Sequence, residues 1–440
     1  MGMRERLLNK ISSREICVGV IGVGYVGLPL AVEKAKAGFR TICFDVSKER
    51  VNLINRGINY VGDVLDYDLK EMVAKGEISA TDDYSRIQEV DFIAICVPTP
   101  LDAYQQPDIR FVRSSAEAIS RYLKKDTMVV LESTTYPGTT RELILPILEK
   151  NSGLECGKDF YLGFSPERVD PGNAVYKTSN TPKVVGGITP EATEVIAAMY
   201  RAVLQGDIFE TSSPEIAEME KILENTYRNI NIGLINEMAQ LCHRMKIDIW
   251  EVVEAAKTKP YGFQAFYPGP GLGGHCIPLD PYYLSWKARE FGFHTSMIES
   301  SMMINDKMPE YCVERASHIL NRVQKSIKGS KILQLGISYK ADIDDFRESP
   351  AIRVFELLKE MGAEVVYYDP CVSDFFYRGH SYASEPVLSS ELIDQSDLVF
   401  ITTDHTKVDY ALVKEHASIV FDTKNIMRRY GITGDNIEIL

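Results

Sequence analysis

The chain has 440 residues, 45% of them hydrophobic, and this length is more than one hydrophobic core accommodates, so we expect two or three domains. Its formal net charge of −13 is spread along the chain with no basic patch, which excludes a protein that binds the nucleic-acid backbone. An anionic ligand must therefore be held by local cations.

Cysteine usage and hydropathy indicate the compartment. The eight cysteines are scattered and form no C-x-x-C pair or cysteine–histidine cluster, so we expect reduced thiols in a cytoplasmic protein and no metal site. No apolar run approaches the roughly 18 residues that span a bilayer, and the N-terminus lacks a signal-peptide hydrophobic region. We therefore expect no membrane partner.

A glycine motif opens the first region. Gly22, Gly24 and Gly27 have the spacing G-x-G-x-x-G, between an apolar run at 16–20 and an alanine-rich helical stretch. In this context the glycines allow a tight turn and let a pyrophosphate reach N–H groups at a helix N-terminus. Asp45 follows a second strand-like run about 20 residues later, where a carboxylate binds both ribose hydroxyls. Because an acid there repels a 2′-phosphate, the pattern predicts NAD rather than NADP.

Short β-branched runs alternate with helical patterns as far as about residue 210, which predicts βαβ units and a mostly parallel sheet. Strands are expected at 17–21, 41–44, 92–97, 128–132, 161–164 and 183–185. Two of them end in turns that carry Thr99 and Thr134. Ligands of open α/β sheets bind at the carboxyl ends of strands, so these threonines are candidates for the nicotinamide side of a site. The loop at 163–172 presents Glu167 and Arg168, either as ligand contacts or as a surface ion pair on a rigid turn.

A long helix is predicted from about residue 211 to 245. It begins either with the capping-box spacing of Ser212 and Glu215 or at Ser213 and Pro214. Its apolar positions keep helical spacing and predict a buried stripe, and the length suggests a spine shared between domains or subunits. The stripe consists of Ile216, Met219, Leu223, Ile230, Leu234, Met238 and Leu241.

On the same helix, Lys221, Asn225 and Arg228 project from one face that is separate from the stripe. Such a row either grips a polar substrate or is a solvated face. Further along, a glycine-rich loop at 271–281 carries Cys276, with Asp280 four residues on, and a lone cysteine in that setting suggests a nucleophile. The adjacent His275 is interpreted as a backbone or substrate contact rather than a base.

A second α/β pattern without the glycine motif occupies the last third of the chain. Strands are expected at 331–337, 364–368, 398–402 and 418–421, and candidate ligand groups at strand ends or in the following turns are Tyr339, Lys340, Arg347 and Lys424. The fold class is therefore α/β, with two Rossmann-like parallel-sheet domains joined by a long central helix. The expected domains are 1–210, which binds NAD, 211–325, which is helical and carries the cysteine loop, and 326–440.

A nicotinamide cofactor together with a nucleophilic cysteine suggests one particular reaction. Oxidising an alcohol to an aldehyde needs no nucleophile, but oxidising the aldehyde further needs a tetrahedral adduct from which hydride can leave. A thiolate supplies it as a thiohemiacetal, which becomes a thioester and then an acid on hydrolysis. Lys221 and Asn225 are candidates for stabilising the oxyanion, and Thr134 with Glu167 for holding and activating water.

Several separated motifs resemble those of the UDP-sugar 6-dehydrogenase family, whose members are NAD-dependent four-electron enzymes. The motifs are Gly22–Pro29, Val97–Pro100, Ser133–Gly138, Pro166–Gly172, Lys221-x-x-x-Asn225, Gly273–Pro281 and Tyr339–Pro350. The resemblance implies an N-terminal NAD-binding Rossmann domain, a helical dimerisation spine and a C-terminal UDP-binding domain. It implies a UDP-hexose substrate and a homodimer or higher homo-oligomer.

The resemblance also implies individual roles. Cys276 would be the nucleophile, assisted by Lys221 and Asn225, with Asp280 handling or positioning a proton. The implied cofactor contacts are Tyr25, Val26, Asp45, Arg50, Thr99, Thr134 and Arg347, the last across a subunit boundary. The implied substrate contacts are Glu167, Arg168, Val169, Lys221, Asn225, Arg228, Phe266, Tyr267, Gly273, Tyr339, Lys340 and Lys424.

The substrate is suggested by departures within the cysteine loop. His275, Ile277 and Leu279 replace the serine, phenylalanine and lysine typical of the UDP-glucose branch, which favours an N-acetylated sugar. Gly262 stands where the UDP-N-acetylmannosamine enzymes tend to have arginine, so the chain looks most like the UDP-N-acetylglucosamine 6-dehydrogenases. The product would feed a surface polysaccharide or O-antigen. The alternatives are a UDP-N-acetylmannosamine or UDP-glucose 6-dehydrogenase, a two-electron β-hydroxyacid dehydrogenase, and an NAD-sensing or scaffolding protein without activity.

Overall fold

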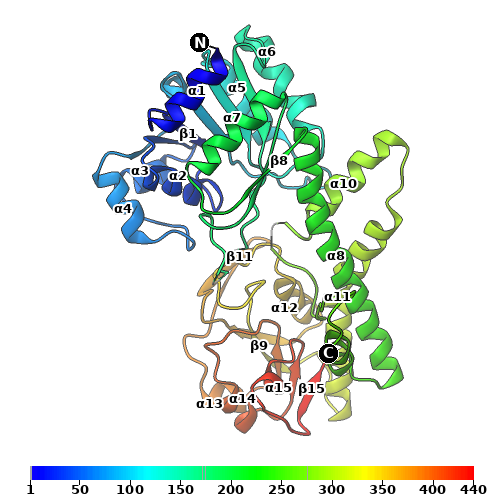
Figure 1. Cartoon of the computed structure of the whole chain (residues 1–440). Helices are drawn as coiled ribbons and strands as arrows, with labels where there is room; N and C mark the ends of the chain where they lie inside the picture. Colours follow the sequence, from blue (N-terminus) through cyan, green and yellow to red (C-terminus); the bar gives the residue numbers. More distant parts are fainter. Residues whose placement is uncertain (1, 171, 174, 275) are drawn as a thin grey trace. The chain divides into compact units, whose positions relative to one another are not determined.

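The computed structural model describes residues 2–170, 172–173, 175–274 and 276–440, and it divides into two compact units. The N-terminal unit comprises the chain up to Glu224 together with Tyr282–Gly292, and the C-terminal unit comprises Asn225–Pro281 and Phe293–Leu440. The long helix α8 (Pro214–Met245) supplies residues to both units (Figure 1). Among the described residues no helix is both long and apolar enough to cross a membrane.

The N-terminal unit is built on an eight-stranded sheet in the order β3-β2-β1-β4-β5-β6-β7-β8, in which only the β6–β7 pair is antiparallel. The strands are β1 Val18–Ile21, β2 Thr41–Phe44, β3 Ile78–Thr81, β4 Phe92–Ile95, β5 Thr127–Leu131, β6 Phe160–Phe164, β7 Lys183–Gly187 and β8 Ile208–Thr211. The helices are α1 Met3–Ser12, α2 Gly27–Lys36, α3 Lys48–Asn55, α4 Asp66–Ala74, α5 Arg110–Ser120, α6 Leu145–Ser152 and α7 Pro190–Arg201, with short helical turns at Tyr84–Glu89 and Thr140–Ile144.

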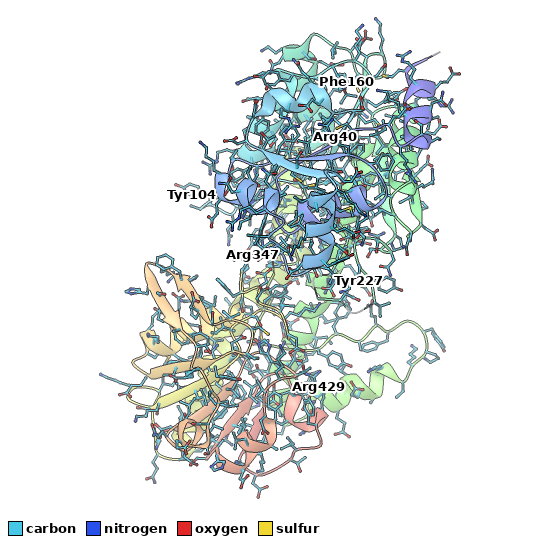
Figure 2. All side chains as sticks on the ribbon, turned by 90° about the vertical axis from the view of Figure 1, so that its left-hand side faces the viewer. Arg40, Tyr104, Phe160, Tyr227, Arg347 and Arg429 are labelled. Atoms are coloured by element: carbon cyan, nitrogen blue, oxygen red, sulfur yellow. The ribbon has the colours of Figure 1, made fainter. Side chains whose placement is uncertain are left out.

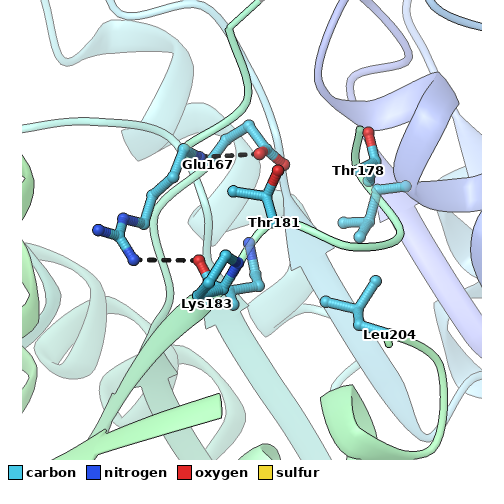
Figure 3. A pocket seen from close by; sticks show the side chains of 8 residues that line it. Glu167, Thr178, Thr181, Lys183 and Leu204 are labelled. Carbon is cyan, nitrogen blue, oxygen red and sulfur yellow. Dashed lines mark hydrogen bonds between the residues drawn. The ribbon is translucent and has the colours of Figure 1, made fainter. Parts of the chain in front are cut away.

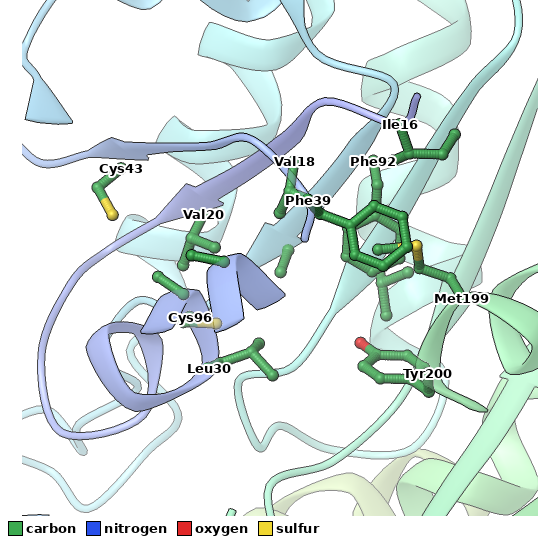
Figure 4. Packing of buried hydrophobic residues seen from close by; sticks show 14 of the residues in the cluster. Ile16, Val18, Val20, Leu30, Phe39, Cys43, Phe92, Cys96, Met199 and Tyr200 are labelled. Carbon is green, nitrogen blue, oxygen red and sulfur yellow. The ribbon is translucent and has the colours of Figure 1, made fainter. Parts of the chain in front are cut away.

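Alternate residues of the central strands face opposite sides of this sheet, because side chains alternate along a strand. On β4, Phe92 and Ala94 pack in one core with residues of α1, α2 and α7, whereas Ile93 and Ile95 pack in the other with residues of α5 and α6. Figure 4 shows part of the first core, which includes Leu30, Phe92 and Tyr200, and the rings of Phe92 and Tyr200 meet edge to face. Helices on both faces bury the central strands β1, β2, β4, β5 and β6, which explains why these strands are continuous apolar runs.

The C-terminal unit contains a parallel five-stranded sheet in the order β10-β9-β13-β14-β15 and an antiparallel hairpin, β11–β12. The strands are β9 Lys331–Leu335, β10 Glu364–Tyr368, β11 Asp374–Tyr377, β12 His380–Ala383, β13 Leu398–Ile401, β14 Val420–Asp422 and β15 Ile437–Ile439. The helices are α9 Ile249–Lys257, α11 Ser296–Arg322, α12 Pro350–Glu360, α13 Ser390–Asp394, α14 Tyr410–His416 and α15 Ile426–Arg429. The helix α10 Asp280–Ala288 begins in this unit but belongs mainly to the N-terminal unit, as does the short turn at Arg289–Phe291.

The predicted α/β class is confirmed, and every strand that the sequence predicts is present within a few residues of its expected bounds. The sequence did not predict the edge strands β3, β8 and β15 or the two strands of the hairpin, β11 and β12. These segments are short and mix polar with apolar residues, so they lack the continuous apolar run that marks a buried strand. α8 begins at Pro214, the second of the two predicted starts.

The apolar stripe of α8 is not buried in this chain, so that prediction is wrong. Ile216, Met219, Leu223, Leu234 and Leu241 are between 42% and 61% exposed. The buried side chains of the helix include both polar and apolar residues. Two of the polar ones face α11, where Asn229 accepts a hydrogen bond from Ser301 and Asn236 donates one to Asn305. Helical periodicity identifies an apolar face but does not reveal whether the same chain covers it.

Candidate functional site

The glycine turn after β1 has the geometry that its motif predicts. Gly22 has a φ of +84°, and a Cβ there would lie 2.8 Å from the carbonyl oxygen of Cys96, while a Cβ at Gly27 would overlap the carbonyl oxygen of Gly22. Gly24 differs because a Cβ there would meet nothing within 4 Å. Two glycines are thus required by the protein's own packing, and the third leaves the open space that a pyrophosphate needs to approach the backbone.

Asp45, one residue beyond β2, is buried beside this turn. Its Oδ2 accepts a hydrogen bond from the backbone N–H of Val23 at 3.1 Å and lies 3.7 Å from Arg50 Nη1, and its Oδ1 accepts from Ser47 N at 2.8 Å. Tyr25 is 43% exposed on the turn, and Val26 caps the start of α2. The open glycine, the helix N-terminus and the neighbouring carboxylate together fit a dinucleotide.

The two threonines predicted for the nicotinamide side follow adjacent strands. β4 and β5 pair in parallel with Ile95 opposite Leu131, so the turns after them share one edge of the sheet. Ser133 Oγ donates to the carbonyl of Val97 at 2.7 Å and joins the two turns. Thr99 is buried and its carbonyl accepts a hydrogen bond from the Tyr283 hydroxyl, whereas Thr134 is half-buried.

The loop after β6 holds Glu167 by its own backbone. Glu167 Oε1 accepts hydrogen bonds from the N–H groups of Arg168 at 2.8 Å and Val169 at 2.9 Å. The side chain lines a small pocket of about 10 Å³, together with Thr181 and Lys183 (Figure 3). This volume is about that of one water molecule, so the carboxylate has room for a single water on this side.

Arg168 makes ion pairs, but they are half-buried contacts with α8 rather than the surface ion pair on the turn that the alternative interpretation of this loop predicts. Its guanidinium pairs with Glu224 and lies 3.4 Å from Glu220, both on α8, and it donates to the carbonyl of Pro182 at 3.0 Å. The hydrogen bonds that Arg168 donates to the Glu224 carboxylate outweigh the cost of burial and raise the pKa of Arg168. An anion that binds Arg168 must therefore share it with these carboxylates.

The polar row predicted on α8 (Lys221, Asn225 and Arg228) is partly buried. Lys221 and Asn225 are 6% and 5% exposed, whereas Arg228 is exposed. One turn before Lys221, the buried Glu218 accepts hydrogen bonds from Gly138 N at 2.6 Å and from both N and Oγ1 of Thr140. Glu218 ties the turn that follows Thr134 to α8, and sequence reasoning missed it because its partners lie about 80 residues away.

The cysteine loop is closed by short-range contacts in the C-terminal unit. The carbonyl of Cys276 accepts from the N–H groups of Leu279 at 3.1 Å and Asp280 at 2.9 Å, so Cys276 lies on a helical turn that leads into α10. Asn225 Nδ2 donates to Asp280 Oδ2 at 2.5 Å, which joins two predicted site residues. Asn229, another residue that the sequence did not single out, donates to the carbonyl of Ile277 at 3.1 Å. His275 lies outside the described residues.

Glycines before Cys276 let the segment that follows β9 pack against the loop. A Cβ at Gly273 would overlap Tyr339, and one at Gly274, where φ is +82°, would lie 2.9 Å from the ring of Tyr339. Gly274 N donates to the carbonyl of Arg347 at 3.3 Å. The structure thus brings together the cysteine loop and the segment at 339–350, two motifs that are far apart in the sequence.

The remaining predicted residues of the C-terminal unit have defined surroundings. Arg347, labelled in Figure 2, forms a bidentate pair with Asp345 at 2.9 and 2.7 Å, and Lys340 is half-buried in the same segment. Lys424 follows β14. Its Nζ lies close to Gly269, in the loop that leads to Cys276, since a Cβ added at Gly269 would be 3.6 Å from it. These cations therefore gather near the glycine-rich loop or the segment that packs on it.

Phe266 and Tyr267 pack against helices. The ring of Phe266 meets that of Tyr227 edge to face at 5.9 Å, and Tyr267 stacks on Trp250 while its hydroxyl donates to Glu254 at 2.6 Å. Tyr267 keeps 40% of its surface exposed. The structure gives both residues a structural role, and their predicted role in substrate binding stays a prediction.

One group of metal-ligand types occurs among the described residues, at Asp369, Cys371 and His405. The Asp369 carboxylate already accepts four backbone N–H bonds, including those of Ile337 and Ser338, and lies 3.0 Å from His405 Nε2. Its lone pairs are largely used by the loop that precedes Tyr339. The cluster is therefore built to shape that loop rather than to hold an ion.

Comparisons with known proteins agree with this geometry. The models of the UDP-glucose/GDP-mannose dehydrogenase family match the chain at residues 16–204 (NAD binding domain), 215–307 (central domain) and 333–429 (UDP binding domain). The UDP-N-acetyl-D-glucosamine 6-dehydrogenase of Pseudomonas aeruginosa is 38% identical over 361 residues, which cover 82% of this chain and 84% of the relative.

Relatives named for a second sugar are also similar. The UDP-N-acetyl-D-mannosamine dehydrogenase of Pyrococcus horikoshii is 33% identical over 418 residues, which cover 93% of this chain and 96% of the relative. A solved structure of the UDP-D-ManNAc dehydrogenase from the same organism matches with a TM-score of 0.87 at 30% identity, covering 96% of this chain and 99% of that one.

Proposed function

Since this chain belongs to the UDP-glucose/GDP-mannose dehydrogenase family and is an NAD-dependent UDP-sugar dehydrogenase, we propose a specific substrate for it. We propose that it oxidises the C6 hydroxyl of UDP-N-acetylglucosamine to give UDP-N-acetylglucosaminuronic acid. The product would serve surface polysaccharide or O-antigen synthesis. With its scattered cysteines, the enzyme would work in the cytoplasm.

The sequence before and around Cys276 supports this choice of sugar. Gly262 replaces the arginine expected of a UDP-N-acetylmannosamine enzyme, and the similarity to a UDP-N-acetyl-D-glucosamine 6-dehydrogenase is consistent with it. UDP-N-acetylmannosamine is the second candidate, because dehydrogenases named for that sugar match over 93% of the chain. UDP-glucose is third.

The cofactor would be held by the N-terminal unit. Gly22, Gly24 and Gly27 would admit the pyrophosphate, and Asp45 would accept hydrogen bonds from the adenosine ribose. The further contacts that we propose are Tyr25, Val26, Arg50, Thr99, Thr134 and Arg347. When bound, NAD supplies hydride acceptance, once for each of two oxidations.

The loop around Cys276 is the observation that carries the proposal. Its turn is fixed by Asp280, and Asp280 is held by Asn225, so the thiol is presented by a preorganised loop. We propose that the Cys276 thiolate bonds to C6 of the aldehyde and so forms a thiohemiacetal, with Lys221 and Asn225 stabilising the oxyanion. Asp280 would position the reacting groups and handle a proton.

Hydrolysis completes the reaction. After the second oxidation the sugar is a thioester on Cys276, and a water oxygen attacks its carbonyl carbon while the carbon–sulfur bond breaks and the thiolate leaves. Thr134 would hold this water, and Glu167 would take its proton, since a carboxylate near a water-sized space can act as a general base. The products are the uronic acid and regenerated Cys276.

The rest of the UDP-sugar would be bound by cations and backbone groups. We assign it to Arg168, Val169, Arg228, Phe266, Tyr267, Gly273, Tyr339, Lys340 and Lys424, in addition to Glu167, Lys221 and Asn225. Tyr339 and Lys340 follow β9 and Lys424 follows β14, which places them at the carboxyl end of the second parallel sheet. Ligands of open parallel sheets bind at that end.

We also propose that the protein is at least a homodimer, joined through the exposed stripe of α8. Apolar side chains recur in steps of three or four residues, a spacing that packs one helix against another, at positions 216, 219, 223, 227, 230, 234, 238, 241 and 245. Most of them are exposed within one chain. A second copy of the same helix would cover a face that water otherwise contacts.

The decisive measurement is the NADH formed per UDP-N-acetylglucosamine consumed, in the wild type and in Cys276→Ala. We expect two NADH per sugar from the wild type, and we expect the variant to form no uronic acid because it has no thiol to carry the thioester. Loss of a nucleophile that acts with its partners lowers kcat by roughly 10⁴-fold or more.

One NADH per sugar from the wild type would contradict the thioester route and favour a two-electron dehydrogenase. Turnover of UDP-N-acetylmannosamine but not of UDP-N-acetylglucosamine would move the assignment to the second candidate. Cys242→Ala is the matched control, because this cysteine is also half-buried but lies on α8 outside the proposed chemistry.

A further inference from the structure

Four polar side chains are buried together in the N-terminal unit. Glu132, Lys183, Lys34 and Tyr200 are 1%, 4%, 0% and 0% exposed. They come from the end of β5, the start of β7, helix α2 and helix α7. None of them belongs to a motif that the proposed mechanism uses, so the cluster needs its own explanation.

The cluster is centred on the Glu132 carboxylate. Oε2 accepts a hydrogen bond from Lys183 Nζ at 2.6 Å, and Oε1 accepts one from the Tyr200 hydroxyl. Lys183 Nζ also donates to the carbonyl of Pro166 at 3.0 Å. One buried ammonium therefore joins the end of β5 to the loop after β6.

Both joined segments lead directly into residues with proposed roles. Glu132 lies two residues before Thr134, and Pro166 is the residue before Glu167. The Glu167 carboxylate is oriented by backbone N–H groups of its own loop, so a shift of the backbone at Pro166 shifts the carboxylate. Lys183 also lines the small pocket beside Glu167 (Figure 3).

Stability alone is a weak reason for this arrangement. Removing two charges from water is costly, and well-packed apolar side chains of similar volume are often equally stabilising. What an ion pair adds is direction, because its hydrogen bonds fix the atoms that they join. Here the atoms so fixed belong to the two loops that carry Thr134 and Glu167.

Lys34 shares the cluster but joins neither loop. Its ammonium has no hydrogen-bond partner among the described residues and lies over the rings of Phe92 at 4.2 Å and Tyr200 at 4.5 Å. Burial lowers the pKa of Lys34 to about 8, against the attraction of Glu132. The residue offers a matched control, since removing it changes the buried charge without cutting a link between the loops.

We propose that Lys183 and Glu132 are positioning residues for the hydrolytic half of the reaction, holding Thr134 and Glu167 where they activate the water that attacks the thioester. The inference rests on the proposed function and deepens it. Neither residue touches the reacting atoms, so both act through the loops that they join. The oxidation steps do not use this water. At saturating NAD and UDP-sugar, where weaker binding through Thr134 or Glu167 is overcome, they should be affected much less.

The test compares Lys183→Met, Glu132→Gln and Lys34→Met with the wild type, using UDP-N-acetylglucosamine and NAD. Rapid mixing would measure NADH formation in the first turnover and in the steady state, and intact-mass spectrometry after acid quenching would detect acyl-enzyme. A displacement of about 1 Å can cost roughly 10²-fold in rate, so we expect the steady-state rate of Lys183→Met and Glu132→Gln to fall by about that factor.

The expected signature is specific for stalled hydrolysis. In Lys183→Met and Glu132→Gln, a burst of two NADH per active site should precede the slow steady state, and the acyl-enzyme should accumulate on Cys276. Lys34→Met should turn over at the wild-type rate without accumulation. A burst slowed as much as the steady state, with no acyl-enzyme, would overturn the proposal.

Folding of the variants is checked by circular dichroism and thermal melting. Should Lys183→Met fail to fold, Glu132→Gln, which keeps the shape of the side chain, carries the same expectation. If both fail while Lys34→Met folds, the cluster is a stability element and the proposal is overturned. A wild type that forms no uronic acid from any UDP-hexose would refute the proposed function itself, which is a different result from a working wild type whose variants do not stall.

Discussion

At the scale of the residue, two arginines show that the carboxylates around a side chain affect whether it can bind a ligand. Arg168 and Arg347 both resemble ligand contacts by motif, and in the structure both hold carboxylates, Arg347 the nearby Asp345 and Arg168 the distant Glu224. Asp345 is two residues from its partner and is visible in the sequence, whereas Glu224 is 56 residues from Arg168. An arginine that is already paired is preoriented, but a substrate anion must compete for it.

The carboxyl pair beside Arg168 should make stability depend on pH. Burial and the neighbouring Glu224 raise the pKa of Glu220 to about 7, because Glu224 keeps its charge through Arg168. A carboxyl whose pKa is higher in the folded protein than its usual 4.5 favours folding less as pH rises from about 4.5 to about 7. Glu220→Gln removes this penalty, so after discounting for its partial exposure we expect about 1 kcal/mol more stability than the wild type at pH 7.5, and no difference at pH 4.5.

Urea unfolding of both proteins at several pH values would measure the difference. Glu237→Gln, an exposed carboxylate of the same helix, is the control and should follow the wild type. Parallel curves for Glu220→Gln and the wild type would show that Glu220 ionises normally in the folded protein.

At the scale of the element, α8 shows which features of a helix follow from the sequence and which depend on the rest of the fold. Its 32 residues, its start at Pro214 and its apolar spacing follow from the sequence. Which face of the helix is buried does not follow from the sequence, because the buried face includes Asn225, Asn229 and Asn236, which form hydrogen bonds with distant parts of the chain. Polar residues on a buried helix face need partners that the sequence alone does not identify.

The exposed stripe predicts the effect of charge on assembly. Leu223→Glu and Leu234→Glu, at positions 61% and 51% exposed in one chain, should turn the dimer into a monomer, since each would bury a charge between two copies. Light scattering after size-exclusion chromatography measures the mass. Met361→Glu, at an apolar position 47% exposed at the end of α12, is the control and should stay dimeric. Retention of the wild-type mass in both stripe variants would place the interface elsewhere.

At the scale of the whole molecule, the chain consists of two units. Each has its own cores and its own sheet, which is parallel in the C-terminal unit and mostly parallel in the N-terminal unit. The NAD binding domain model matches in the first and the UDP binding domain model in the second. The two ligands should therefore stabilise different parts of the protein.

Calorimetry can test this division. We expect NAD to raise the melting temperature of one unfolding transition and UDP that of another, each by the equivalent of about 2.7 kcal/mol at a ligand concentration 100 times its Kd. Asp45→Ala should lose the shift caused by NAD and keep the shift caused by UDP, because this carboxylate lies beside the glycine turn and its contacts with described residues are all within the N-terminal unit. Loss of both shifts in that variant would mean that the units do not bind their ligands separately.

The α/β class, the dinucleotide turn, the cysteine loop and the family could be predicted without a structure, since each depends on short-range spacing such as G-x-G-x-x-G or i, i+4 on a helix. Only the tertiary structure decided that the α8 stripe is exposed, that Glu218 holds the turn after Thr134, and that Lys183 joins two loops through Glu132. The physical reason is that these contacts connect residues about 20 to 80 positions apart, where packing rather than local periodicity selects the partner.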